Sequence, residues 1–204
     1  MSAKAEEVQA LSDSLFHWSY YAPDLKCEIG TTAFRINGGL VVIDPVPLAE
    51  PAWQELLAGS PLRAIFLTNG NHVREAALLR KQHHVPLVTA PDTRRDMSEI
   101  KPEVVLLPNE LIYGIASVAI PGATPGETAF FSNTGVMVVG DAIINTSLET
   151  GIEFLPDKYC TDAKANRASL HKLLDYDFHT LTFAHGAPVT THAKDKLKAL
   201  LASS

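Results

Sequence analysis

A chain of 204 residues with 46% hydrophobic and 20% charged residues has the size and composition of one globular domain, so we expect a single domain over residues 1–204. The formal charge of −6 provides no basic surface for nucleic acid or for an anionic membrane, and we expect neither partner. No apolar run approaches the ~20 residues of a membrane helix, and the polar start has no export signal, so we expect a cytoplasmic protein.

The first part of the chain predicts short strands. Aromatic or β-branched runs at 15–20, 31–36 and 40–43 are each bounded by Pro, Gly or Asn, which is typical of strands. Asn37-Gly38-Gly39 lies between the second and third runs and predicts a hairpin turn.

Helical and strand patterns then alternate. Helices are predicted over 50–58 and 72–83, and strands over 64–67 and 86–89. Alternation of this kind predicts locally parallel strands with helices packed outside them.

Strand patterns return after residue 103, and the order of the first half is repeated. Strands are predicted over 104–107, 115–120, 128–132, 136–139 and 181–184, and helices over 162–174 and 193–201. Asp162 is a candidate N-cap. Two such halves predict an α/β (α+β) fold in which two sheets lie face to face with helices outside, a four-layer αββα sandwich.

Short motifs at the ends of these strands resemble, in order, those of the metallo-β-lactamase superfamily. The matching segments are LVVIDP at 40–45, FLT at 66–68, PGATPG at 121–126, GD at 140–141 and HG at 185–186. The family normally has Thr-His-x-His-x-Asp-His at the second motif and Pro-Gly-His-Thr-Pro-Gly at the third. The resemblance covers nearly the whole chain and implies the αββα sandwich of glyoxalase II-like proteins. It does not by itself imply activity, because a fold does not fix a function.

The resemblance also implies a two-metal site. In an ungapped alignment, however, most of its ligand positions hold side chains that are poor metal ligands. Side chains that cannot ligate, or ligate poorly, then stand at five of the family's ligand positions: Asn69, Asn71, Val73, Arg74 and Ala123. The family's Asp and closing His remain as Asp141 and His185. On this match no transition metal should bind well, because a permanently charged guanidinium has no lone pair to offer.

A match that deletes two residues from the loop gives a different result. Asn71-His72 then occupies the family's Asp-His pair, and the next helix starts at Val73 in the family's register. His72, Asp141 and His185 would hold one divalent ion with open positions. The sequence alone does not decide which alignment of the 68–75 loop is correct.

Each of these residues also has an ordinary structural interpretation. Asp141 can cap a turn at a strand end, His185 can form hydrogen bonds below a pocket, and His72 can start a helix and donate to the backbone. Cys27 and Cys160 lie far apart in the chain and are expected to be reduced thiols.

The resemblance implies a pocket at the metal site, and two further residues are candidates for lining it. Arg74 lies near the former metal cavity, where its charge can replace a cation and bind an anion. Lys158 belongs to a loop at 157–160 that is expected near the pocket mouth.

The predicted function follows from the losses at the ligand positions. We expect a non-catalytic or altered homologue without a cofactor, which binds a small molecule or an anion among the pocket candidates: Asn69, Asn71, Arg74, Ala123 and Lys158. The alternative is a hydrolase with one Zn or Fe ion on His72, Asp141 and His185, acting on an ester- or thioester-like substrate.

Overall fold

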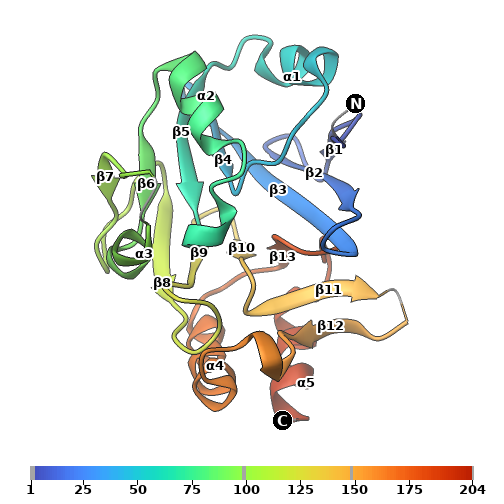
Figure 1. Cartoon of the computed structure of the whole chain (residues 1–204). Coiled ribbons are helices and arrows are strands. Elements are labelled where there is room, and N and C mark those ends of the chain that lie inside the picture. Colours follow the sequence, from blue (N-terminus) through green and yellow to red (C-terminus); the bar gives the residue numbers. More distant parts are fainter. Residues whose placement is uncertain (1–2, 98–99, 148, 204) are drawn as a thin grey trace.

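The computed structural model describes residues 3–97, 100–147 and 149–203. Its strands form a seven-stranded sheet, a four-stranded sheet and a separate two-stranded hairpin. Figure 1 shows α1 and α2 at one end of the view and α4 and α5 at the other, with the strands between them.

The larger sheet has the order β1-β2-β3-β4-β5-β6-β7. Its strands are β1 Gln9–Ala10, β2 Leu15–Ala22, β3 Cys27–Ile36, β4 Gly39–Ile43, β5 Leu62–Leu67, β6 Leu87–Thr89 and β7 Val104–Val105. The first four strands pair antiparallel and the last four pair parallel. The parallel strands are linked through three helices: α1 Glu50–Leu57, α2 Ala76–His83 and α3 Pro91–Asp96. The sequence pattern predicts the first two of these links.

The smaller sheet has the order β13-β10-β9-β8, with β10 and β13 parallel. Its strands are β8 Ile115–Ala119, β9 Thr128–Ser132, β10 Val136–Val139 and β13 Thr180–Phe183. The hairpin consists of β11 Ile143–Ser147 and β12 Gly151–Phe154. The helical segments of this half are α4 Ala163–Leu170 and α5 Ala193–Ala202, with the 3-10 turns η2 Asp157–Tyr159 and η3 His171–Asp175.

Three apolar clusters define the layers. The central one joins the two sheets, and in it the rings of Phe66 on β5 and Phe130 on β9 meet edge to face at 5.4 Å. A second cluster packs α1 and α2 on the larger sheet, with Trp18 and Trp53 6.1 Å apart. The third packs α4 and α5 on the smaller sheet. Helix, sheet, sheet and helix therefore follow one another, which confirms the predicted αββα sandwich.

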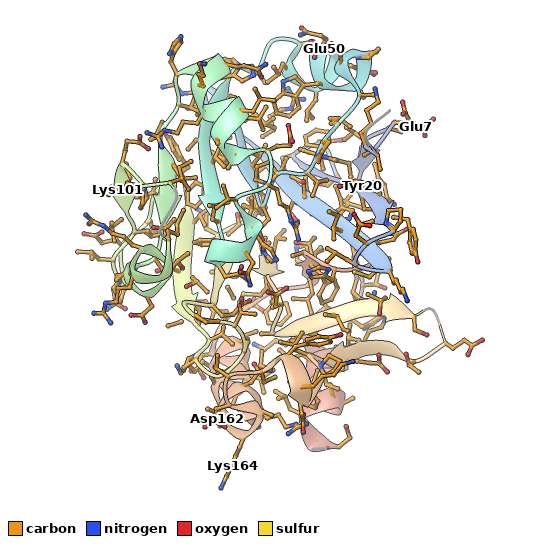
Figure 2. The ribbon with its side chains drawn as sticks, in the orientation of Figure 1. Glu7, Tyr20, Glu50, Lys101, Asp162 and Lys164 are labelled. Atoms are coloured by element: carbon orange, nitrogen blue, oxygen red, sulfur yellow. The ribbon has the colours of Figure 1, made fainter. Side chains whose placement is uncertain are left out.

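The predicted strands over 128–132 and 136–139 have the bounds of β9 and β10. The N-cap prediction is also confirmed: Asp162 Oδ1 accepts a hydrogen bond of 2.9 Å from the backbone N–H of Ala165. Figure 2 shows Asp162 at α4 and Lys164 extending away from the fold.

The prediction of one helix over 72–83 is wrong. A 3-10 turn, η1 Gly70–His72, comes first, and α2 begins only at Ala76. The break has a local cause, because the backbone of Arg74 has a φ of 34°, a value that an α-helix does not allow. The sequence pattern also missed α3 and the β11–β12 hairpin.

Among the described residues, no helix combines the length and the apolar composition needed to cross a membrane.

Candidate functional site

Polar side chains from both sheets meet where parallel strands end. Asp44 follows β4, Thr68 and Asn69 follow β5, Asp141 follows β10 and His185 follows β13. The carboxyl ends of parallel strands lie at the same edge of a sheet, which is where open α/β sheets place their ligand sites. Gly140 permits the close approach, since a Cβ there would lie 2.4 Å from Thr68 Oγ1.

Asp44 positions the ring of His72. The carboxylate accepts hydrogen bonds from Thr68, at 2.9 Å from the backbone N–H and 2.6 Å from the hydroxyl. His72 Nδ1 lies 3.0 Å from Asp44 Oδ2, and both side chains are 3% exposed. Asp44 has a φ of 53°, a left-handed conformation that Asp adopts more readily than most residues. The carboxylate thereby fixes the orientation of the imidazole.

His72, Asp141 and His185 form the centre of the site. Both histidines direct Nε2 at the same oxygen, Asp141 Oδ1, at 3.2 Å for His72 and 3.0 Å for His185. One ligand atom from each of the three residues lies within 4.8 Å of the other two. The structure therefore brings together the three residues on which the gapped alignment depends. The His72 ring contacts carboxylates, so the simpler interpretation as a helix-start residue donating to the backbone does not hold.

A buried amide joins two acidic side chains beside this centre. Asn69 Nδ2 donates to Glu127 Oε2 at 2.7 Å and to Asp141 Oδ2 at 2.9 Å. Glu127 also accepts from the backbone N–H of Asp141 at 2.9 Å and from the Thr124 hydroxyl at 2.8 Å. The Asn69 side chain thus places its two N–H groups between two carboxyl groups.

The buried charges shift one another's protonation. Burial lowers the pKa of His72, and so does Arg74, but Asp44 and Asp141 outweigh both and raise it to about 9. Burial opposes ionisation of Asp141, yet His72 and His185 hold the pKa of its carboxyl well below the usual range. Burial, together with the charge of Asp141, raises the pKa of Glu127. In the absence of metal, these interactions favour the protonated imidazole of His72 at neutral pH.

Arg74 supplies a second cation, which is half-buried. Its guanidinium donates to the backbone carbonyl of Gly30 at 3.4 Å. Burial lowers the pKa of Arg74, whereas Asp44 and Asp141 raise it. The group stays charged at neutral pH, since an arginine pKa lies far above 7. Its positive charge compensates the acidic groups from inside the fold.

A cavity of about 420 Å³ opens in front of Asp141 and His185. Its polar wall includes the Cys27 thiol, Asn71 and Thr124, while apolar side chains form the rest, among them Leu25, Ile144, Leu155 and Tyr159. The cavity therefore offers an apolar surface with a few convergent polar groups, as is usual for small-molecule sites.

Of the five residues that the sequence analysis proposed for the pocket, the cavity lining includes one. Asn71 is exposed and lines the cavity. Asn69 and Ala123 are fully buried, which leaves no surface of either for a ligand. Arg74 is held against the Gly30 carbonyl, and the Lys158 ammonium packs 4.7 Å from the centre of the Tyr159 ring.

Sequence reasoning did not propose Asp44 or Glu127 as site residues. Asp44 belongs to the LVVIDP motif, and its position directly after a buried strand was a usable indication. Glu127 stands between the PGATPG motif and the apolar strand β9. A charged residue in front of a buried strand is unusual, and this is what could have drawn attention to it.

A family model described as the metallo-beta-lactamase superfamily matches residues 9–204. The chain belongs to the metallo-β-lactamase superfamily. A comparison with curated proteins finds no match.

Solved structures share the fold of this superfamily member at low sequence identity. A metallo-beta-lactamase from Pontibacter korlensis is 15% identical with a TM-score of 0.76, over 97% of this chain and 99% of the other. One from Erythrobacter litoralis is 12% identical with a TM-score of 0.71, over 99% and 95% of the two chains. A family protein from Thermus thermophilus is 16% identical with a TM-score of 0.66, over 95% and 80%.

The side chains of this superfamily member do not fit a pair of metal ions. Ala123 has no donor atom, and the Asn69 amide directs its nitrogen, which has no free lone pair, at Asp141 Oδ2. Asp141 would also have to offer lone pairs to two ions at once, and its two oxygens already take part in other contacts. Here one of the two already accepts the amide.

One metal ion does fit the remaining donors. His72 Nε2, Asp141 Oδ1 and His185 Nε2 converge, and three protein ligands with open positions suffice for a divalent ion. The other ring nitrogen of His72 faces Asp44, the kind of carboxylate partner that metal-bound histidines usually have.

Proposed function

We propose that this protein is a small-molecule-binding member of the metallo-β-lactamase superfamily that does not carry out two-metal hydrolysis. The observation that carries the proposal is the Asn69 amide, which donates to Glu127 and Asp141. Its two N–H groups compensate the acidic pair in place of a cation. Together with His72 and Arg74, they would stabilise the site without a metal ion.

The composition of the cavity indicates the kind of ligand. Leu25, Ile144 and Leu155 offer an apolar surface, while Asp141 and His185 add polar groups to the same lining. The lining includes the Asp141 carboxyl but neither Arg74 nor Lys158, so it offers no cationic side chain of these two to an anion. We therefore expect a ligand with an apolar body and a hydrogen-bonding head group that faces Asp141.

The test is binding of small molecules to protein treated with a chelator, observed by NMR in a fragment screen. Shifted resonances should belong to residues of the cavity, and Ile144→Arg, which places a charged side chain there, should abolish them. Leu111→Arg is the matched control, because Leu111 is 63% exposed and lies outside the cavity lining. Binding that survives Ile144→Arg would count against the proposal.

The convergence of three donor atoms within 4.8 Å supports a second candidate function, a hydrolase with one metal ion. His72, Asp141 and His185 would hold the ion and Asp44 would orient His72. The ion would supply an activated water for attack on an ester- or thioester-like carbonyl. Metal analysis of protein purified without chelator tests this candidate. One equivalent of zinc or iron, with ester hydrolysis that Asp141→Ala abolishes, would favour the enzyme over the binding protein.

A further inference from the structure

The thiol of Cys27 and the ring of His185 meet at the wall of the cavity. Cys27 Sγ lies 3.5 Å from His185 Nδ1, within hydrogen-bond reach for sulfur. The two residues are separated by 158 positions, one at the start of β3 and the other just after β13. Both line the cavity together with Asp141.

The hydrogen bonds of Asp141 decide which nitrogen of His185 carries a proton. A carboxylate only accepts, so His185 Nε2, 3.0 Å from Asp141 Oδ1, is the donor. In the neutral ring, Nδ1 then has a free lone pair, and this nitrogen faces the Cys27 thiol. The order thiol, imidazole and carboxylate matches that of a nucleophile, its base and the group that orients the base.

We propose that Cys27 is a nucleophile that accepts acyl groups from small activated esters or thioesters bound in the cavity. The inference rests on the proposed metal-free pocket, because a metal ion at His185 Nε2 would displace the proton that fixes this tautomer. The apolar wall would hold the acyl chain, as proposed above for the body of the ligand.

The chemical step is balanced within the site. Sγ forms a bond to the carbonyl carbon while the S–H proton passes to His185 Nδ1. The carbon–oxygen or carbon–sulfur bond of the substrate then breaks, and the leaving group takes the proton from Nδ1. The products are an S-acyl Cys27 and a free alcohol or thiol, and His185 returns to its starting state.

The base is needed because the thiolate, not the thiol, is the nucleophile, and His185 Nδ1 is the proton acceptor within reach of Cys27 Sγ. The second cysteine of the chain, Cys160, is a matched reference, since it is also a free, half-buried thiol. In the described part of the chain its sulfur contacts the Leu155 carbonyl and the Asn166 amide, and no histidine.

The experiment is acylation of the full-length protein by p-nitrophenyl acetate in the presence of a chelator. Intact-mass measurement counts the acetyl groups, and peptide mapping locates them. In the wild type, Cys27 should be acetylated at least about tenfold faster than Cys160, as expected for a base within reach of one thiol only. Cys27→Ser should remove the fast adduct, and Cys160→Ser should leave it unchanged.

His185→Gln tests the base with little change elsewhere. The Gln amide can still donate to Asp141, but it has no basic nitrogen that could take up the thiol proton. Acetylation of Cys27 should then slow about 100-fold, the typical contribution of a general base. Equal labelling of the two cysteines in the wild type, or an unchanged rate in a folded His185→Gln variant, would overturn the inference.

The experiments distinguish a failure of this inference from a failure of the proposed function. Fragment binding without acetylation of Cys27 would refute this inference alone. A stoichiometric, catalytically required metal ion on His185 would refute the metal-free pocket and this inference with it. Acetylation of Cys27 in a protein whose cavity binds no fragments would refute the proposed small-molecule binding alone.

Discussion

Asn69 and Glu127 share a hydrogen bond of 2.7 Å at a fully buried position, although 58 residues separate them in the chain. The same amide nitrogen lies 2.9 Å from Asp141. An acidic pair can be buried here because a donor stands between its members and because His72 and Arg74 supply positive charge nearby.

Asn69→Asp should strongly destabilise the protein. The change preserves shape but replaces the N–H donor with an oxygen, so that three carboxyl groups face one another in a buried space. We expect a loss of about 3–5 kcal/mol in the free energy of unfolding at pH 7, as for other uncompensated buried charges. The pKa of Glu127 is already raised to about 8, so it is the introduced carboxyl group that takes up a proton on acidification, and the loss should shrink at pH 5. Urea unfolding at both pH values measures it.

Asn109→Asp is the control for this change. Asn109 is exposed and has a φ of 68°, which Asp tolerates as well as Asn does. We expect an effect of no more than about 0.5 kcal/mol. A comparable loss in both variants would show that the buried amide has no special role.

The stability of the protein should fall as the pH rises through 9. The folded state raises the pKa of His72 from 6.5 to about 9, so the proton on His72 favours folding. Its contribution is complete below pH 6.5 and is lost as the pH passes through 9, a change of roughly 3 kcal/mol. His72→Gln should abolish this part of the pH dependence in chemical unfolding. His171→Gln, at an exposed position, should retain it.

The contact between the two sheets gives a prediction about the fold. Phe130 is fully buried and meets Phe66 edge to face between the sheets. Phe130→Ala should cost about 3–5 kcal/mol, because it removes apolar surface and leaves a cavity. Leu111→Ala, at a position 63% exposed, should change the free energy of unfolding by less than about 0.5 kcal/mol. Similar values for the two variants would contradict this view of the central layer.

The sequence predicted the layers because strands such as β9 and β10 are short apolar runs with clear boundaries. It failed where tertiary contacts override the local pattern. The segment 72–83 has helical spacing throughout, yet the ring of His72 is fixed by Asp44 and Asp141, and the chain turns at Arg74 before α2 can begin. The helix α3 has the sequence PDTRRD, which has no apolar periodicity to detect.

The candidate site was predictable only in part for a related reason. Asp141 and His185 lie in motifs at strand ends, where a resemblance can be recognised. The roles of Glu127 and Asn69 depend on each other and arise only once β5 and β9 are stacked. Local sequence cannot tell an amide that compensates a carboxyl pair from an amide in an ordinary loop.

Arg74 gives the sharpest test of the proposal that the site does not use two metal ions. Its guanidinium is close enough to interact electrostatically with Asp44 and Asp141, the residues whose charge would attract a metal ion. Arg74→Gln removes the cation and preserves much of the side-chain volume. The apo protein should lose stability, because two buried carboxylates then share only the charge of His72.

The same change should strengthen binding of zinc. Removing a nearby positive charge lowers the electrostatic cost of bringing in another cation, and we expect an affinity at least about tenfold higher, or about 1.4 kcal/mol. Calorimetric titration of chelator-treated protein with zinc measures the difference. Arg63→Gln is the matched control, because Arg63 is an exposed residue of β5 and should leave zinc binding unchanged. If Arg74→Gln binds zinc no better than the wild type, the guanidinium does not compete with a metal ion, and the loss of donors at Asn69 and Ala123 alone would explain why two ions no longer fit.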